Sequence, residues 1–477
     1  MFFAERYSPP PKRRGWLMRV IRGTGVGGAA VVIPLLAVAL FFLAQYTVTP
    51  PQLYHRAWEK AAQTIYDPTD LGDWAAWEHK FDGQIKTDED AIAKANEALS
   101  SAGDPYTYLM SPQKAADDDD RAAGKFVGVG ITFAIQTDDD GKAVTDKQGA
   151  TLPQVDANGY VIVQSVIEGA PAEQAGIKPG DAIKSVDGVP TKDLAIDDIV
   201  KQVRSGPPGS SVTFVLIRDG KEFPLTVTRN AVKLASVHTR MIAGTNIGYL
   251  RLDDFAQTDA TEQFRAGLEK LKDAEALIID LRGNPGGFVF NSINISSMFI
   301  KQGVVVTIKE RLPGDPKHPA YRVTTHYLTE SKLIEESYTT DNPTQTTRRV
   351  HDRQPYLADD RPVVFLVNEG SASASEMTTG AVHDNGAAKV VGEKTFGKGV
   401  GQSTIMMPNG TRLHVTSLRY YTPNGTWLGN GRARTPDHGE KPANGITPDE
   451  VVMPVKRHFQ LGSPEDNQLQ RAVDLLK

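Results

Sequence analysis

The sequence predicts a mixed α+β and α/β protein, in which an N-terminal transmembrane helix and a helical segment precede a mostly β module and an α/β core. Three observations predict this class. A run without charged residues extends over 23–46. Short alternating runs of Val and Ile with turn signals fill 125–230. Over 235–460, buried-looking strands alternate with amphipathic helices, the pattern of a parallel sheet covered by helices.

The composition fits a folded multidomain protein and removes several classes of function. The chain has 477 residues, enough for two or three domains with sizeable cores. It has no cysteine, which excludes disulfide scaffolds, thiol nucleophiles and cysteine-ligated metal sites. Beyond residue 22, 47 basic residues face 57 acidic ones. This acidic balance disfavours nucleic-acid binding, so we expect no nucleic-acid partner.

The uncharged segment 23–46 is interpreted as a transmembrane anchor. At 1.5 Å per residue, Val26–Tyr46 is long enough to cross a hydrocarbon core of about 30 Å. Basic residues cluster in the tail 1–22, so the positive-inside rule places that tail in the cytoplasm and the rest outside. A cleaved signal peptide, which would have a shorter apolar region, is the alternative. The GxGxxG match at 23–28 follows no strand and does not predict a dinucleotide site.

Residues 52–120 are predicted to be a small helical segment, with its clearest periodicity over 88–100. Four consecutive acids, Asp117–Asp120, are interpreted as a solvated linker, because the alternation of ligands in a calcium loop is missing. Within the β module 125–230, we expect two short helices, at 170–176 and at 196–203.

The core, 235–460, is predicted to carry four buried strands and two helices, followed by a C-terminal helix within 461–477. Its stretch 310–355 is polar with weak periodicity, and we interpret it as an insertion: a lid, a substrate-contacting flap or a variable excursion. The strands are expected at 247–252, 276–281, 362–368 and 389–391, and the helices at 261–271 and 376–383.

Three motifs that follow predicted strands carry the candidate chemistry. In 368–376, small residues between a strand and a helix can expose a serine hydroxyl at a tight turn, with helix N-terminal N–H groups available to an oxyanion. In 392–399, Lys398 lies between glycines and could act as a base if burial lowered its pKa. In 280–287, glycines would let backbone N–H groups approach a ligand, although the same pattern also fits an ordinary loop.

The sequence gives less support to nucleotide hydrolysis and to metal catalysis. The GxxxxGK match at 392–398 is followed by glycine and an apparent strand, whereas a P-loop ATPase needs Ser or Thr and a helix. No HExxH-like pair occurs, so no metal and no cofactor are predicted. His383 is interpreted as a structural or surface residue. The sequons at 409–411 and 424–426 lie between alternating runs and are predicted to be hairpin turns.

Taken together, these segments resemble the carboxyl-terminal processing proteases, or tail-specific proteases, which are serine-lysine peptidases with a PDZ domain. The resemblance covers about 100–477 apart from the insertion. It rests on ordered motifs at 103–109, 128–131, 176–181, 280–287, 370–376, 395–399, 419–423, 445–449 and 466–469.

The resemblance implies that Ser373 is the nucleophile, Lys398 its general base and Gln402 the residue that orients the amine. Residue types alone leave Ser371 and Ser375 open as nucleophiles. It also implies an oxyanion hole made by the backbone N–H of Ala374 and of a glycine in the 284–287 turn; Gly286 is favoured and Gly287 remains an alternative.

The same resemblance implies that 125–230 is a PDZ domain, and that 235–460 is a serine-peptidase core. A peptide tail could add a strand to the module while its carboxylate meets the N–H groups of Gly128, Val129, Gly130 and Ile131. We therefore expect a membrane-anchored serine endopeptidase that captures protein C-termini outside the cytoplasm. The alternative is an inactive PDZ adaptor that only binds tails. A homo-oligomer is left open.

Overall fold

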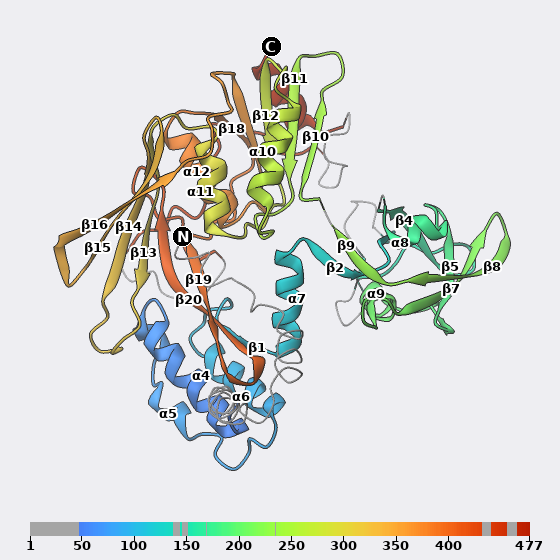
Figure 1. Ribbon diagram of the computed structural model, residues 1–477, viewed down its shortest axis with the longest axis horizontal. Helices are drawn as coiled ribbons and strands as arrows, with labels where there is room; N and C mark the ends of the chain where they lie inside the picture. Colours follow the sequence, from blue (N-terminus) through green and yellow to red (C-terminus); the bar gives the residue numbers. More distant parts are fainter. Residues whose placement is uncertain are drawn as a thin grey trace, which may run out of the picture.

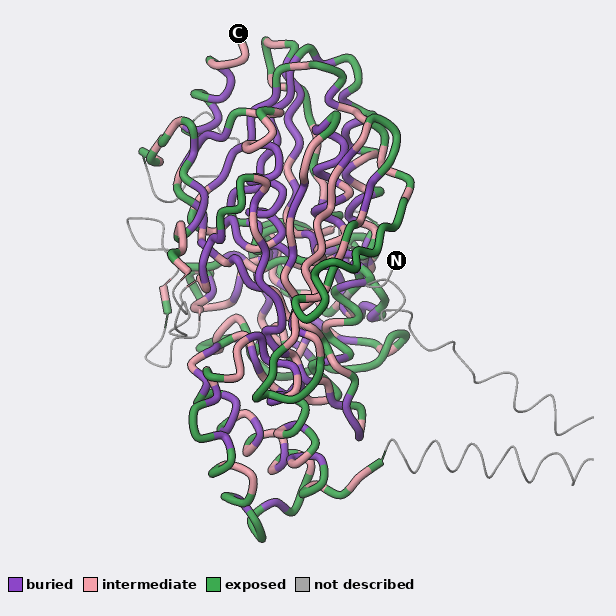
Figure 2. Tube along the Cα trace, turned by 90° about the vertical axis from the view of Figure 1, so that its left-hand side faces the viewer, coloured by how far each residue is buried: buried purple, intermediate pink, exposed green. Residues whose placement is uncertain are grey.

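The computed structural model describes residues 47–136, 144–145, 151–167, 169–233, 235–431, 440–455 and 465–477. The predicted cytoplasmic tail and transmembrane anchor lie outside these residues. Within the described ranges, no helix is both long and apolar enough to span a membrane. Figure 1 shows a helical segment, a β module and a larger core, with α7 lying between the first two. The buried trace concentrates in the strands of the core (Figure 2).

The helical segment packs α4 against α6 and against a strand of the core, β20 (Arg412–Tyr421). Helix α6 coincides with the predicted helix 88–100: the Thr87 hydroxyl accepts a hydrogen bond from Asp90 N–H, and three acids occupy the first turn. Its buried face consists of Ala91, Ala95, Ala98 and Leu99. The elements are α4 (Pro50–Thr64), η1 (Pro68–Leu71), α5 (Ala75–Glu78), α6 (Asp88–Ser100), β1 (Tyr108–Met110) and α7 (Pro112–Ala122).

The predicted linker at Asp117–Asp120 is wrong, because these residues form the middle of α7. Ser111 caps this helix and Pro112 begins it, both favourable at a helix start. The helix buries only Ala115 and Ala122, so the acids occupy its solvent-facing surface. Asp119 also accepts two hydrogen bonds from the Arg412 guanidinium, at 2.7 and 2.6 Å.

The β module is joined to the rest of the chain by a two-stranded ribbon, in which β2 enters and β9 leaves (Figure 1). Its sheet has the order β3-β4-β5-β7-β8, and the predicted helices are present, α8 ending at the left-handed Gly176 (φ 94°). The elements are β2 (Lys125–Gly128), β3 (Ile131–Phe133), β4 (Val161–Val166), α8 (Pro171–Ala175), β5 (Ala182–Val186), β6 (Val189–Pro190), α9 (Ile196–Arg204), β7 (Ser211–Arg218), β8 (Lys221–Thr228) and β9 (Asn230–Lys233).

The central sheet of the core has the order β10-β11-β12-β17-β18-β21, parallel except for the antiparallel β10 at its edge. Strands β12 and β17 are buried at every position, which explains their continuous apolar runs. The elements are β10 (Val237–Met241), β11 (Ile247–Leu252), α10 (Ala260–Lys270), β12 (Ala276–Asp280), α11 (Val289–Ser297), β17 (Val363–Val367), α12 (Ala374–Asp384), β18 (Lys389–Gly392), β21 (Glu450–Val451) and α13 (Asn467–Leu475).

A second sheet has the order β1-β20-β13-β14-β15-β16, with β19 paired to β20. The predicted insertion 310–355 supplies its outer strands. Most of their residues are polar on both faces, so the hydrophobic signal of a strand is weak. Strands β14 and β15 bury only Leu328, Leu333 and Ile334, and β16 is exposed at all but one position. The turn at 408–410 joins β19 to β20, as predicted for this sequon. The strands are β13 (Gly303–Arg311), β14 (Tyr321–Leu328), β15 (Lys332–Thr339), β16 (Asn342–Asp352), β19 (Val400–Met406) and β20.

Candidate active site

The three predicted motifs meet at one edge of the central sheet. They follow the neighbouring strands β12, β17 and β18, and the carboxyl ends of parallel strands lie on the same side of a sheet. Backbone hydrogen bonds join them: Ala372 N–H donates to Asn284 C=O at 3.0 Å, and Phe396 N–H donates to Ser371 C=O at 3.0 Å. The loop 281–287, which alone could have been an ordinary turn, therefore belongs to the same site as the serine and lysine motifs.

Ser373 occupies a strained turn immediately before α12. Its backbone has φ 56° and ψ −116°, a combination that a residue with a Cβ rarely adopts. A strand-to-helix turn of this kind pushes the side chain of its central residue out of the fold, as in a nucleophile elbow. The Ala374 N–H, at the first position of α12, has no hydrogen-bond partner among the described residues.

The two neighbouring serines are buried and already bonded. Ser371 is fully buried, and its hydroxyl donates to Leu281 C=O at 2.8 Å. Ser375 is also fully buried, and its hydroxyl donates to Asn284 C=O at 2.9 Å. Of the three serines, only Ser373 is partly exposed. The alternatives that residue types left open are therefore both structural in this arrangement.

A buried glutamate, Glu376, ties the serine turn to the lysine turn. One carboxylate oxygen, Oε2, accepts hydrogen bonds from the N–H groups of Ser373 at 3.0 Å and Lys398 at 2.8 Å. The other, Oε1, accepts from Thr395 Oγ1 and Gly397 N–H, both at 2.6 Å. Burial raises the pKa of Glu376, and these hydrogen bonds oppose that rise.

No role was predicted for Glu376 from the sequence. The spacing Ser373-x-x-Glu376, a capping-box pattern, is the signal that could have identified it. The buried Tyr420 hydroxyl adds a second link, lying 3.0 Å from Ser373 C=O and 2.6 Å from Lys398 C=O. His383, by contrast, pairs with Asp384 and Asp449.

Lys398 lies in a half-buried environment that favours its neutral form. Burial lowers the pKa of Lys398, while the negative charges of Asp104 and Glu376 raise it to a smaller extent. The ammonium nitrogen lies 4.1 Å from the centre of the Tyr106 ring. Both Asp104 and Tyr106 belong to the 103–109 motif, so the helical segment forms one wall around the lysine.

The side chain of Lys398 is hydrogen-bonded to Gln402, with Nζ donating to Oε1 at 3.1 Å. Gln402 is itself fixed, because its amide donates to Thr416 Oγ1 at 3.0 Å. No hydrogen bond joins Lys398 Nζ to the Ser373 hydroxyl within the described part of the chain. The structure thus brings Lys398 and Gln402 together and links the backbones of Ser373 and Lys398, but leaves the two side chains unbonded.

The glycine turn lies directly against the serine. A Cβ on Gly286 would come 2.8 Å from Ala374 N and 2.6 Å from Ala372 C=O, so only glycine fits. The N–H of Gly286 donates to Asn284 Oδ1 at 2.9 Å. The N–H of Gly287 has no partner among the residues that the structure describes.

The loop 128–131 of the β module, like the glycine turn at 284–287, contains backbone N–H groups without a hydrogen-bond partner among the described residues. Gly130 has φ 80°, and a Cβ there would come 2.3 Å from the Ala170 side chain. Within the described ranges, neither the Val129 nor the Gly130 N–H has a hydrogen-bond partner. The following strand, β3, carries the half-buried Ile131 and Phe133, which pack on the module's core together with Ile196 of α9.

Comparison with known proteins agrees with this architecture. Residues 246–452 match the model of peptidase family S41, and 129–228 match that of the PDZ domain. The carboxyl-terminal-processing protease of Picosynechococcus sp. is 30% identical over 430 residues, which cover 88% of this chain and 88% of that protein. The chain belongs to the carboxyl-terminal-processing proteases. It is a serine-type peptidase with a PDZ domain, which confirms the family predicted from the motifs.

The chain is similar to two further proteins. The carboxyl-terminal-processing protease of Synechocystis sp. is 29% identical over 435 residues, covering 89% of this chain and 86% of the relative. Among solved structures, the photosystem II D1 C-terminal processing protease is 23% identical, with a TM-score of 0.46, and the match covers 90% of this chain and 97% of that one.

Proposed function

We propose that the protein is a membrane-anchored endopeptidase that hydrolyses peptide bonds with Ser373 as nucleophile and neutral Lys398 as general base. The observation that carries this proposal is the strained, partly exposed Ser373 beside two buried and bonded serines. The lowered pKa of Lys398 supports it, because a neutral amine can accept the hydroxyl proton.

Catalysis requires Lys398 to leave its present position. The amine must turn from Gln402 toward the Ser373 hydroxyl, accept its proton as Oγ attacks the scissile carbonyl, and then donate that proton to the leaving amine. In the second half of the reaction, Lys398 accepts a proton from water as the water attacks the acyl-enzyme. Lys398 then donates that proton to Ser373 Oγ as the carboxylic acid product leaves. In the resting enzyme Gln402 accepts a hydrogen bond from the Lys398 amine, and it orients the amine again when the lysine side chain turns back.

The oxyanion is stabilised by backbone N–H groups. Ala374 N–H supplies one donor at the positive end of α12. For the second donor we take Gly287, because the N–H of the favoured Gly286 is already donated to Asn284. In this account the role of Gly286 is steric, since any larger residue would collide with the serine turn.

Substrate tails bind the PDZ domain. The unbonded N–H groups of Val129 and Gly130 suit a terminal carboxylate, and the edge of β3 next to α9 suits an added peptide strand. The anchor at 23–46 holds the enzyme in the cell membrane, with its catalytic part outside the cytoplasm. Carbonate extraction tests the anchor: the full chain should remain with the membranes, and a chain lacking residues 1–46 should be released.

The decisive experiment compares cleavage of an unstructured protein by the wild type, Ser373→Ala and Lys398→Ala. Both variants should lose activity, while Ser373→Ala should still bind a tail peptide. Lys394→Ala is the matched control: Lys394 lies on the same turn, but its amine donates to Ala443 C=O at 2.9 Å. If both variants cleave as fast as the control, the mechanism is wrong. If the wild type binds tails and cleaves nothing, the protein is the inactive adaptor.

A further inference from the structure

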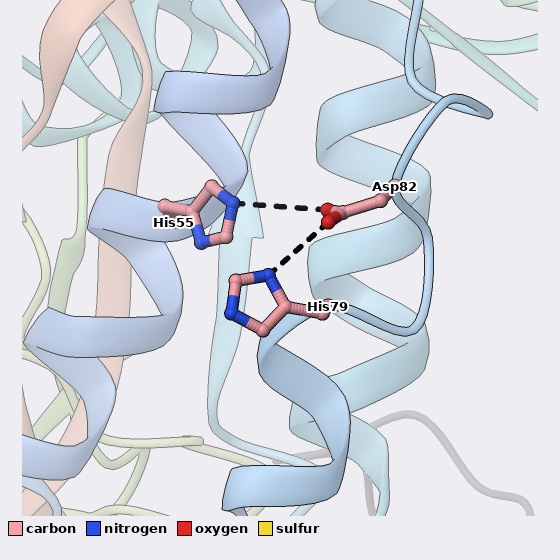
Figure 3. Close-up of side chains that lie close together, drawn as sticks. All are labelled: His55, His79 and Asp82. Carbon is pink, nitrogen blue, oxygen red and sulfur yellow. Dashed lines mark hydrogen bonds and ion pairs between the residues drawn. The ribbon is translucent and has the colours of Figure 1, made fainter.

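Two histidines and an aspartate meet on the surface of the helical segment, on elements that take no part in the peptidase site. His55 projects from α4, whereas His79 and Asp82 lie in the turn after α5 (Figure 3). His79 Nδ1 is 3.1 Å from Asp82 Oδ2, and His55 Nε2 is 3.9 Å from Asp82 Oδ1. One donor atom from each residue lies within 4.8 Å of the other two.

We propose that His55, His79 and Asp82 bind a single divalent transition-metal ion of the zinc type. Two imidazole nitrogens and one carboxylate oxygen are a donor set that Zn²⁺ prefers, with bonds of about 2.0–2.2 Å. Such bonds in tetrahedral geometry place neighbouring donors roughly 3.4 Å apart. The His79–Asp82 pair is already that close, and the widest pair must approach by no more than roughly 1.4 Å, within reach of side-chain rotation.

The backbones that carry these ligands are held together. Trp58 Nε1–H donates to Trp74 C=O at 2.9 Å, and Trp74 Nε1–H donates to Trp58 C=O at 3.1 Å. Their rings are parallel, with an interplanar angle of 2°. The Tyr54 hydroxyl donates to Trp77 C=O in the same contact. Because α4 and α5 are fixed to each other in this way, ion binding needs little backbone ordering.

Charges around the three ligands favour a cation. Glu78 Oε1 lies 3.9 Å from His79 Nε2, the ring nitrogen that does not face Asp82. At this distance the Glu78 carboxylate adds negative charge beside the histidine without forming a hydrogen bond to it. The nearby Lys80 is held elsewhere, over the Trp77 ring at 3.5 Å and 3.7 Å from Glu97. A bound ion would cross-link α4 to the turn between α5 and α6, with solvent at its fourth position.

A second pair provides a matched control. His318 Nδ1 lies 3.1 Å from Asp315 Oδ2, with the same separation in sequence as Asp82 and His79, but this pair belongs to no three-donor group within the described residues. If two donors sufficed, His318→Gln would reduce ion binding as much as His79→Gln. The proposed site predicts that it does not.

The test is calorimetric titration of Zn²⁺ into the full chain after removal of metal with a chelator. We expect one equivalent with a dissociation constant below about 10 µM, and at least about tenfold weaker binding for each of His55→Gln, His79→Gln and Asp82→Asn. His318→Gln should bind like the wild type. Cobalt should give the visible absorption of a tetrahedral ion in the wild type and lose it in the three variants.

Circular dichroism and the melting temperature of the metal-free variants control for folding, because only a variant that melts like the wild type reports on binding. Asp82→Asn is nearly isosteric and keeps an acceptor oxygen, so it preserves the fold if the histidine variants do not. The proposal is overturned if the wild type binds no zinc below about 10 µM, or if binding survives all three substitutions. Neither readout depends on peptidase activity.

Discussion

Replacing Glu376 by glutamine tests whether the buried carboxylate holds the two catalytic turns in place. Each carboxylate oxygen accepts two hydrogen bonds. A glutamine amide that points its NH₂ group at the Ser373 and Lys398 N–H groups loses two charge-assisted bonds. In the other orientation the Gly397 N–H bond is lost, while the Thr395 hydroxyl can rotate to accept from the NH₂ group. At about 1.5–3 kcal/mol for each lost bond, the loss is about 1.5–6 kcal/mol.

A partial offset comes from removing a buried charge, whose cost is evident in the raised pKa of Glu376. We therefore expect a net destabilisation of about 2–4 kcal/mol, seen as a melting temperature several degrees lower. Because the NH₂ group displaces either the Ser373 and Lys398 N–H groups or the Gly397 N–H group next to Lys398, kcat/KM should fall by about 10²-fold, the effect of a misplacement near 1 Å.

The assay is steady-state cleavage of an unstructured protein, well below the melting temperature, with calorimetric unfolding of the same samples. Glu369→Gln is the control, since Glu369 is exposed on the loop that leads to Ser373. A Glu376→Gln enzyme with kcat/KM within about threefold of the wild type would refute the positioning role.

Three further predictions concern the base, its partner and the core. Activity should rise with pH through an inflection below 10.5, the ordinary lysine pKa, because burial lowers the pKa of Lys398. A flat pH–rate profile, measured where chemistry limits the rate, would contradict this. Gln402→Glu should move that inflection to higher pH, because a carboxylate stabilises the ammonium form of Lys398. An unmoved inflection in the pH–rate profile would show that Gln402 does not act on Lys398. Arg282→Met should lower the free energy of unfolding by about 3–5 kcal/mol, because it leaves Asp280 and Asp466 buried without their cation; unchanged calorimetric unfolding would show that the pairs contribute nothing.

Much of the core could be predicted from the sequence, because its local signals agree with the fold. Strand β11 coincides with the predicted 247–252, since a strand buried on both faces is mostly apolar and only Gly248 and Arg251 interrupt this run. The motifs that follow β12, β17 and β18 could be expected at one sheet edge, because the carboxyl ends of parallel strands lie on the same side of a sheet. The strands β14–β16 could not be predicted, because most of their residues are polar on both faces and their few buried apolar residues do not alternate regularly.

Within the site, residue types left Ser371, Ser373 and Ser375 open as nucleophiles, and only the family resemblance selected Ser373. Neither source gives the contacts that arrange Ser373 and Lys398. The burial of Ser371 and Ser375 depends on how the 281–287 loop packs below them. The bond from Gly286 N–H to Asn284 Oδ1 is a turn geometry that the glycine pattern does not specify. The proximity of His55, His79 and Asp82 could not be predicted, because His55 lies 24 positions before His79 and the two meet only where α4 packs on α5.

The most direct test of the account identifies the residue that becomes acylated. The full-length enzyme would be mixed with an activated peptide ester, quenched in acid before deacylation, and mapped by tandem mass spectrometry. The account predicts one acyl group, on Ser373, that is absent from Ser373→Ala and strongly reduced in Lys398→Ala at neutral pH. An acyl group on Ser371 or Ser375, or undiminished acylation of Ser373 without the lysine, would contradict it.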